Sequence, residues 1–280
     1  MLAEKVQTFD GTLTAVRVGR GRDVVVLHSL LTDRHAFDAI LPALGTHFRL
    51  TLINLPGFHG STPVQATMDA YAGRIHAALS DFGIGRGALV IGNGFGGMVA
   101  LAVALAHPKL IGRLLLCDVA AGFPIEAKQA FRLMANKVAA AGMASVAELA
   151  TYRIFHPDYL ASHPRAIEER RAVLLNVDPI AFAAACSVLV TTDLTAQLKS
   201  LRAATLVVCG ERDQATPPSL NRQIAEAVPG ARYVEIPGCG HCPPLEQPEA
   251  FLAVVRDFIG LPKESAAPSR GAPAPAPVKG

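Results

Sequence analysis

The stretch LVIGNGFGGMVAL, residues 89–101, contains the signal that decides the fold. Its first residues are branched and apolar, which is typical of a buried strand, and its last residues form an apolar run of helical character. Four glycines separate the two runs, all within residues 92–97. We therefore expect a strand that turns sharply into a helix at the carboxyl edge of an α/β sheet.

Strand-like and helix-like segments alternate on both sides of this turn. Two short alternating segments, at 5–9 and 13–18, predict a hairpin across Asp10 and Gly11. Further strands are predicted at 23–28, 48–53, 88–91, 110–117, 205–209 and 231–236, and helices at 33–44, 68–82, 95–107, 218–227 and 248–258. Continuous apolar strands separated by helices indicate a mostly parallel, doubly wound sheet.

Residues 120–194 interrupt this alternation. Strand-like runs are missing there, and Ala-rich sequence with helical spacing replaces them. An insertion after a parallel strand emerges at the edge where such sheets bind ligands, so we expect these helices to cap a binding site. The predicted organisation is a core of residues 1–119 and 195–262, a helical cap of 120–194 and a disordered Pro/Ala-rich tail over 263–280.

Composition and charge narrow the classes of partner. The 280 residues are 51% hydrophobic and 18% charged, with a net charge of +3, which is an ordinary globular balance. Without a basic run interleaved with aromatics, or an apolar run of membrane-spanning length, neither nucleic acid nor a membrane is an expected partner. We expect a monomer or homodimer that acts on a small-molecule substrate.

The cysteines and residues 1–11 indicate in which compartment the protein is expected to work and whether it is expected to bind a metal. Five scattered cysteines do not suggest a disulfide framework, and residues 1–11 do not have the pattern of a signal peptide, so we expect a cytoplasmic protein. The string Cys239-Gly240-His241-Cys242 lacks the second ligand pair of a structural zinc site. We therefore expect no metal and no cofactor.

Three loops that directly follow predicted strands contain the candidate site residues. The glycine turn has Gly94 at its third position, Asp213 follows the strand that ends at Cys209, and His241 lies between the last strand and the last helix. The carboxyl ends of parallel strands meet at one edge, so these loops are predicted to lie together. Their order is the turn, then the aspartate, then the histidine.

These motifs, in this order, resemble the α/β-hydrolase fold family over residues 1–262, and are most similar to enol-lactonases, meta-cleavage-product hydrolases and small esterases. The motifs are LHSLLTD (27–33), NLPGFHGST (54–62), GNGFGG (92–97), GERDQATPP (210–218) and GCGHCPPLEQPEAF (238–251). The resemblance implies a parallel sheet with an inserted helical cap, and cofactor-independent hydrolysis of a small carboxylic ester, lactone or ketone C–C bond.

The resemblance also implies roles for three residues. The third position of the glycine turn, Gly94, is the nucleophile position, where the family has a serine. His241 is implied to be the base that takes the proton of the nucleophile, and Asp213 to be the carboxylate that orients the histidine and stabilises its charged form.

Further residues are implied around this centre. The oxyanion is expected to bind the backbone N–H groups of Phe95 and of Leu30, in the loop after the third strand. Because both donors belong to the main chain, they do not depend on the side chain at position 94. The residues predicted to contact substrate are His28, Ser29 and Asn93.

Two departures from the family pattern concern the attacking group. Gly94 has no hydroxyl, so no acyl-enzyme can form on its side chain, and in a serine protease the equivalent loss costs roughly six orders of magnitude in kcat. Ser29 stands where the family usually has glycine. Its hydroxyl could contact substrate, hold a water or act as a relocated nucleophile, or Ser29 could be a tolerated loop residue.

Several hypotheses remain at the level of the sequence. Gly94 is a natural or an engineered replacement of a serine, or His241 and Asp213 activate a water in its place. Alternatives are a binding protein derived from a hydrolase, and a lyase-type or oxygenase-type enzyme without a cofactor. The arginines that could meet a substrate carboxylate in the cap are Arg132, Arg153 and Arg165.

Overall fold

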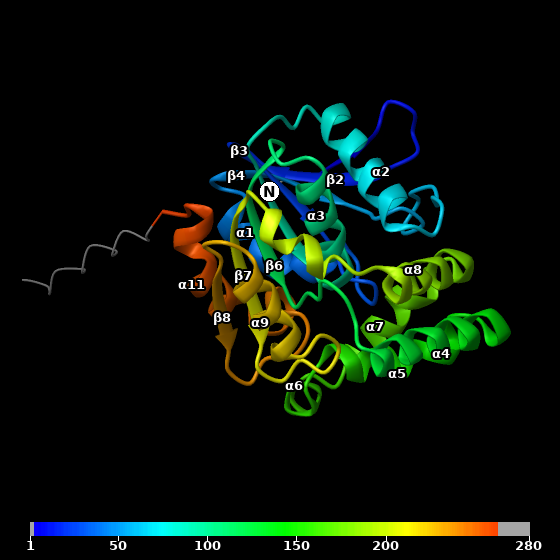
Figure 1. Cartoon of the computed structure of the whole chain (residues 1–280). Helices are drawn as coiled ribbons and strands as arrows, with labels where there is room; N and C mark the ends of the chain where they lie inside the picture. The colour runs from blue at the N-terminus through cyan, green and yellow to red at the C-terminus, as the bar shows by residue number, and fades with distance from the viewer. Residues whose placement is uncertain (1–2, 263–280) are drawn as a thin grey trace, which may run out of the picture.

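Residues 3–262, which the computed structural model describes, form an eight-stranded sheet with helices packed around it (Figure 1). The order is β1-β2-β4-β3-β5-β6-β7-β8, and only β2 pairs antiparallel with its neighbours β1 and β4 in this described part. The strands are β1 (Ala3–Gln7), β2 (Thr14–Gly19), β3 (Arg22–Leu27), β4 (Phe48–Ile53), β5 (Ala88–Asn93), β6 (Ile111–Cys117), β7 (Ala204–Gly210) and β8 (Arg232–Ile236). The predicted mostly parallel sheet is confirmed.

The helices that flank the sheet pack in two groups. Contacts join α2, α3, η2 and α9 in one group, and η1, α1, α10 and α11 in the other. The helices are η1 (Arg34–Ile40), α1 (Leu41–Leu44), α2 (Met68–Asp81), α3 (Gly94–Ala106), η2 (Thr195–Ser200), α9 (Pro218–Ala227), α10 (Pro243–Glu246) and α11 (Pro248–Ile259). Buried, branched side chains of β3 to β7 form the core between these layers.

The chain between β6 and β7 is helical, and we call it the helical segment (Figure 1). Gly122 and Asp193 form an isolated β-bridge, so the two ends of this segment leave and re-enter the core side by side. Its division from the core at residues 120 and 194 stays a prediction. The helices are α4 (Ile125–Ala141), α5 (Ala144–Ile154), α6 (Pro157–Ser162), α7 (Ala166–Leu175) and α8 (Pro179–Thr191).

The stretch predicted as one helix over 33–44 is divided in the structure. It begins as the 3₁₀ helix η1 and continues as the short helix α1, with Pro42 in the first turn of α1. A proline has no N–H to donate backwards, so it interrupts the α-helical hydrogen-bond ladder here. The expected tail, 263–280, lies outside the described residues.

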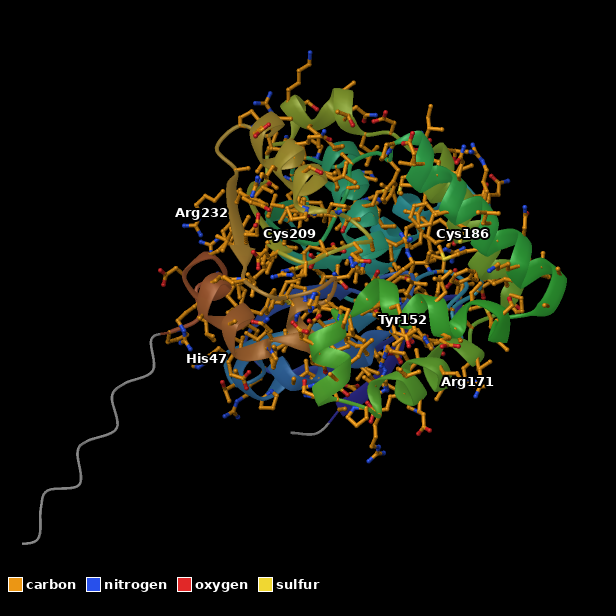
Figure 2. The ribbon with its side chains drawn as sticks, turned by 90° about the horizontal axis from the view of Figure 1, so that it is seen from below. His47, Tyr152, Arg171, Cys186, Cys209 and Arg232 are labelled. Carbon is orange, nitrogen blue, oxygen red and sulfur yellow. The ribbon has the colours of Figure 1, made fainter. Side chains whose placement is uncertain are left out.

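No single helix within residues 3–262 is long and apolar enough to cross a membrane, although α7 and α8, counted together as a bent pair, reach that length and composition. All five cysteines, which lie in this part of the chain, are free and buried. Figure 2 shows Cys209 in the sheet layer and Cys186 among the helices of the helical segment.

The turn between β5 and α3 is held by a close approach of two backbones. Gly94, the first residue of α3, has φ +52°, a conformation that L side chains rarely adopt. Gly96 donates from its N–H to the carbonyl oxygen of His28 at 3.0 Å, and a Cβ on Gly96 would lie 2.4 Å from the same oxygen. The missing side chain therefore lets the start of α3 contact the end of β3.

Replacing Gly96 by alanine is expected to lower the free energy of unfolding by about 1–3 kcal/mol or more, because the new methyl group must displace the backbone of residue 28. The matched control is Gly73→Ala, in the middle of α2, where a Cβ meets no atom within 4 Å. That change is expected to stabilise the protein by about 0.5–1 kcal/mol. Urea denaturation measures both, and a Gly96→Ala variant as stable as the parent would contradict this packing.

Candidate active site

The loops after β3, β5, β7 and β8 meet at the carboxyl edge of the sheet, beneath the helical segment. Ser29, Leu30, Gly94, Phe95 and His241 all line the same cavity. Asp213 lies directly behind His241 and is buried. The structure thus brings together the three strand-end loops that the sequence analysis singled out.

His241 and Asp213 form a buried hydrogen-bonded pair. Nδ1 of His241 lies 3.0 Å from Oδ2 of Asp213, and both residues are at least 96% buried (4% and 3% exposed). Burial favours the neutral carboxyl, but the charge and hydrogen bond of His241, with hydrogen bonds from Thr216, outweigh it and lower the pKa of Asp213 to about 2. The ionised carboxylate holds the proton on Nδ1, which leaves Nε2 as an acceptor facing the cavity.

Thr216 completes the surroundings of this carboxylate and was not identified from the sequence. Its hydroxyl donates to Oδ2 of Asp213 at 2.6 Å, and its backbone N–H, with that of Ala215, donates to Oδ1 at 3.1 and 2.7 Å respectively. The ATPP string after Asp213 is a turn signal, but a sequence does not show which turn hydroxyl points back at the acid.

The backbone of His241 is fixed from two sides. Its N–H donates to the carbonyl oxygen of Ile154, the last residue of α5, at 2.7 Å. Its own carbonyl oxygen accepts from Nδ2 of Asn93 at 3.0 Å. The histidine loop therefore connects the end of β5 with the helical segment.

Ser29 occupies the space beside Gly94. Its Oγ lies 3.2 Å from Nε2 of His241, and a Cβ built on Gly94 would lie only 2.2 Å from that Oγ. The same Cβ would lie 2.9 Å from Nε2 of His241. The hydroxyl of Ser29 thus stands where a side chain at position 94 would begin.

The backbone N–H groups predicted for the oxyanion are free to bind one. Leu30 and Phe95 line the cavity and are buried, and within residues 3–262 neither amide donates to a protein acceptor. Buried amides almost always have a partner in folded proteins, so two orphaned donors facing one cavity indicate a site for an oxygen-bearing ligand. Phe95 also lies at the positive end of α3.

His28 and Asn93 do not have the places predicted for them as substrate contacts, because neither lines the cavity. Nε2 of His28 accepts from the N–H of Leu55 at 3.1 Å, so its Nδ1 carries the proton and donates to the carbonyl oxygen of Ser29 at 2.8 Å. Asn93 donates to the carbonyl oxygens of Cys117 and His241. Both ring nitrogens of His28 and Nδ2 of Asn93 therefore bond backbone groups and hold the loops together, while Oδ1 of Asn93 is buried without a hydrogen-bond partner.

A second carboxyl, Asp118, lies beside Asp213 at the end of β6. It is fully buried, and its Oδ1 accepts from the N–H of Gly210 at 2.8 Å. Burial, together with the negative charge of Asp213, raises the pKa of Asp118 well above its usual range. The two neighbouring carboxyls are thus shifted in opposite directions: the pKa of Asp213 is lowered and that of Asp118 is raised. The sequence contains a signal by which Asp118 could have been identified, because this acidic residue directly follows a buried strand.

Three side chains lie close enough together to be considered as metal ligands. One possible ligand atom from each of Asp118, Asp213 and His241 lies within 4.8 Å of the others. The hydrogen bonds of these groups do not fit the binding of a metal ion. The oxygens of Asp213 already accept from two amides, the Thr216 hydroxyl and His241. Nδ1 of His241, the nitrogen nearest to the carboxylate, is used in that pair. We therefore interpret His241 and Asp213 as a hydrogen-bonded pair and not as metal ligands.

The cavity is apolar and small, with a volume of about 30 Å³. Of the three arginines considered in the helical segment, Arg153 alone lines this cavity, and its guanidinium stacks on Phe131 at 5.9 Å. Nε of Arg153 is buried without a hydrogen-bond partner. The apolar side chains that line the cavity include Leu31, Met98, Phe123, Phe131 and Leu189.

The fold and this site define a class: an α/β protein with a histidine–carboxylate pair and free backbone donors at the strand ends. Residues 24–254 match the model of the alpha/beta hydrolase family, and the chain belongs to that family. The predicted resemblance is confirmed.

Proteins to which this chain is similar include an esterase, a lactonase and a polyketide synthase. The chain is 28% identical to pimeloyl-(acyl-carrier protein) methyl ester esterase of Aromatoleum aromaticum, over 85% of this chain and 98% of that protein. It is similar in structure to the enol-lactonase of Burkholderia xenovorans, with a TM-score of 0.84, 26% identity and coverage of 92% and 100%. It is 30% identical to polyketide synthase ThaQ of Burkholderia thailandensis, matching 92% of this chain but 13% of that protein.

Separate substitutions of Asp213 and Asp118 test which of the two carboxyls acts on His241. Asp213→Asn removes the ionised partner of His241 and is expected to lower kcat by about 10³- to 10⁴-fold, because the histidine loses its tautomer and the stabilisation of its charged form. Asp118→Asn keeps an oxygen that can accept from the N–H of Gly210 and is expected to change kcat by less than about threefold. Steady-state ester hydrolysis measures both. A larger loss in Asp118→Asn would show that the acid has been assigned to the wrong carboxyl.

Proposed function

We propose that this chain hydrolyses a small carboxylic ester or lactone, with His241 and Asp213 as the proton-transferring pair. The observation that carries the proposal is the placement of Nε2 of His241 in an apolar cavity beside the free N–H groups of Leu30 and Phe95. A general base and two oxyanion donors around one point are what acyl transfer requires. The names of an esterase and a lactonase among the relatives favour this C–O cleavage over cleavage of a ketone C–C bond.

The chemistry follows from the geometry. A substrate carbonyl carbon in the cavity, beside the Oγ of Ser29, would point its oxygen toward the amides of Leu30 and Phe95. An attacking hydroxyl transfers its proton to Nε2 of His241, and Asp213 stabilises the resulting charge. The protonated histidine then donates from Nε2 to the leaving alkoxide. A protein that only bound ligands would not need a base held in one tautomer, so we prefer an enzyme to a binding protein.

We propose further that the substrate carries an anionic group near the carbonyl. Arg153 is the guanidinium that lines the cavity, with an Nε that has no hydrogen-bond partner. Burial lowers the pKa of Arg153, because a desolvated guanidinium is less favourable in its charged form. A carboxylate on the acyl group would supply the missing partner through a charge-assisted hydrogen bond.

His241→Ala tests the hydrolase itself. Removal of the base is expected to lower kcat/KM at least about 100-fold for every ester that the parent hydrolyses, since general-base catalysis contributes about 10² to 10⁴. The assay uses p-nitrophenyl esters of short acids and a panel of enol-lactones. Activity that is indifferent to the loss of His241 would contradict an enzyme working through this site.

Arg153→Met tests the anionic substrate. The KM for monomethyl succinate is expected to rise about 10- to 100-fold, because a charge-assisted hydrogen bond is lost, while hydrolysis of the neutral methyl butyrate changes little. Arg165→Met is the matched control, since Arg165 lies exposed at the start of α7, 3.9 Å from Glu169. Equal increases in KM for the two esters would show that Arg153 acts only through packing.

A further inference from the structure

We infer that Ser29 is the nucleophile of this site, in place of a residue at position 94. The inference rests on the proposed hydrolase function and names its attacking atom, the Oγ of Ser29. The competing assignment is a water activated by His241. Four observations carry the choice of Ser29: its distance to the base, the space that it fills, its rigid backbone and the amides beside it.

The first two observations concern position. Ser29 is 2% exposed and lines the cavity, and its Oγ lies 3.2 Å from Nε2 of His241, which is within hydrogen-bond reach. The Oγ also lies 2.2 Å from the Cβ that Gly94 lacks. A water at the same place would have to displace this hydroxyl, which already lies within hydrogen-bond reach of the base.

The backbone of Ser29 is held at three points, which keeps the hydroxyl in one place. Its N–H donates to Oγ1 of Thr32 at 3.1 Å, and its carbonyl oxygen accepts from the N–H of Thr32 at 3.4 Å and from Nδ1 of His28 at 2.8 Å. A group held in this way loses little entropy when it reacts. The loop after β3 thus gives Ser29 the rigidity that a nucleophile needs.

The free amides suit an attack from Ser29. Leu30 follows Ser29 directly, as the residue after the nucleophile supplies one oxyanion donor in the family turn. The second donor, Phe95, then comes from the facing loop. A nucleophile on either loop therefore has one oxyanion donor in the next residue of its own loop and a second donor in the opposite loop. The oxyanion site is thus the same whether the attacking hydroxyl belongs to the loop after β3 or to the loop after β5.

Gly94 is required for this arrangement. A side chain at position 94 would place its Cβ 2.2 Å from Oγ of Ser29, closer than real Cβ contacts, and 3.0 Å from Cβ of Ser29. A serine at position 94 and the present orientation of Ser29 exclude each other. Gly94 is thus the residue that gives Ser29 access to the base.

The reaction balances with water as the second substrate. The Oγ of Ser29 attacks the carbonyl carbon while its proton moves to Nε2 of His241, and collapse of the intermediate breaks the C–O bond as that proton passes to the leaving oxygen. An ester bond now joins the acyl group to Ser29. Water then attacks the same carbon, gives its proton to His241, and releases the carboxylic acid as the proton returns to Oγ.

The test is intact-mass and peptide analysis after reaction with a fluorophosphonate, together with the kinetics of Ser29→Ala. We expect one adduct on Ser29 in the parent, no adduct in Ser29→Ala, and a loss of kcat/KM of at least about 10³-fold in that variant. Ser61→Ala is the matched control, because Ser61 is an equally buried serine that donates to the carbonyl oxygen of Asn54 and lies outside the cavity. It should keep the adduct.

The double variant Ser29→Gly, Gly94→Ser shows whether the loss of activity in Ser29→Ala comes from the missing hydroxyl or from a folding defect. It moves the hydroxyl to the other loop, so we expect an adduct on residue 94 and recovery of at least about 10-fold in kcat/KM over Ser29→Ala. If Ser29→Ala keeps its activity while His241→Ala loses it, the proposed hydrolase function holds, but the nucleophile is water and not Ser29. If the adduct forms on another residue, the assignment is overturned as well.

Discussion

The close approach of α3 to the end of β3 is the constraint on which the site depends. Gly96 allows its N–H to reach the carbonyl oxygen of His28, and this contact brings the loop after β3 against the loop after β5. The two loops then share one cavity, one base and one pair of amides. Any side chain on Gly96 would separate them.

Because the two loops are so close, the attacking hydroxyl can belong to either of them. His241 accepts a proton at Nε2 wherever the hydroxyl is attached, and the donors of Leu30 and Phe95 are backbone groups. The chain meets the geometric requirement with a side chain from the other loop, and the glycine at position 94 makes that possible. Catalysis depends on the positions of atoms, and a residue's place in a motif matters only through them.

The sequence predicted the sheet, the three strand-end loops and the resemblance to the family, since buried strands and strand-end residues follow from local patterns. It could not choose among the alternatives for Ser29, because that choice depends on a distance between loops 65 residues apart in the chain (29 and 94). The same reason explains why the sequence does not show the contacts of His28 and Asn93. The ring of His28 and Nδ2 of Asn93 bond backbone groups that no local pattern reveals.

A crystal structure of the protein after brief exposure to a slowly hydrolysed ester would show directly which group attacks the substrate. We expect continuous density from Oγ of Ser29 to the acyl carbon, with the carbonyl oxygen within hydrogen-bond distance of the amides of Leu30 and Phe95. An intact ester in the cavity, with a water between its carbonyl carbon and Nε2 of His241 and the Ser29 hydroxyl turned away, would contradict it.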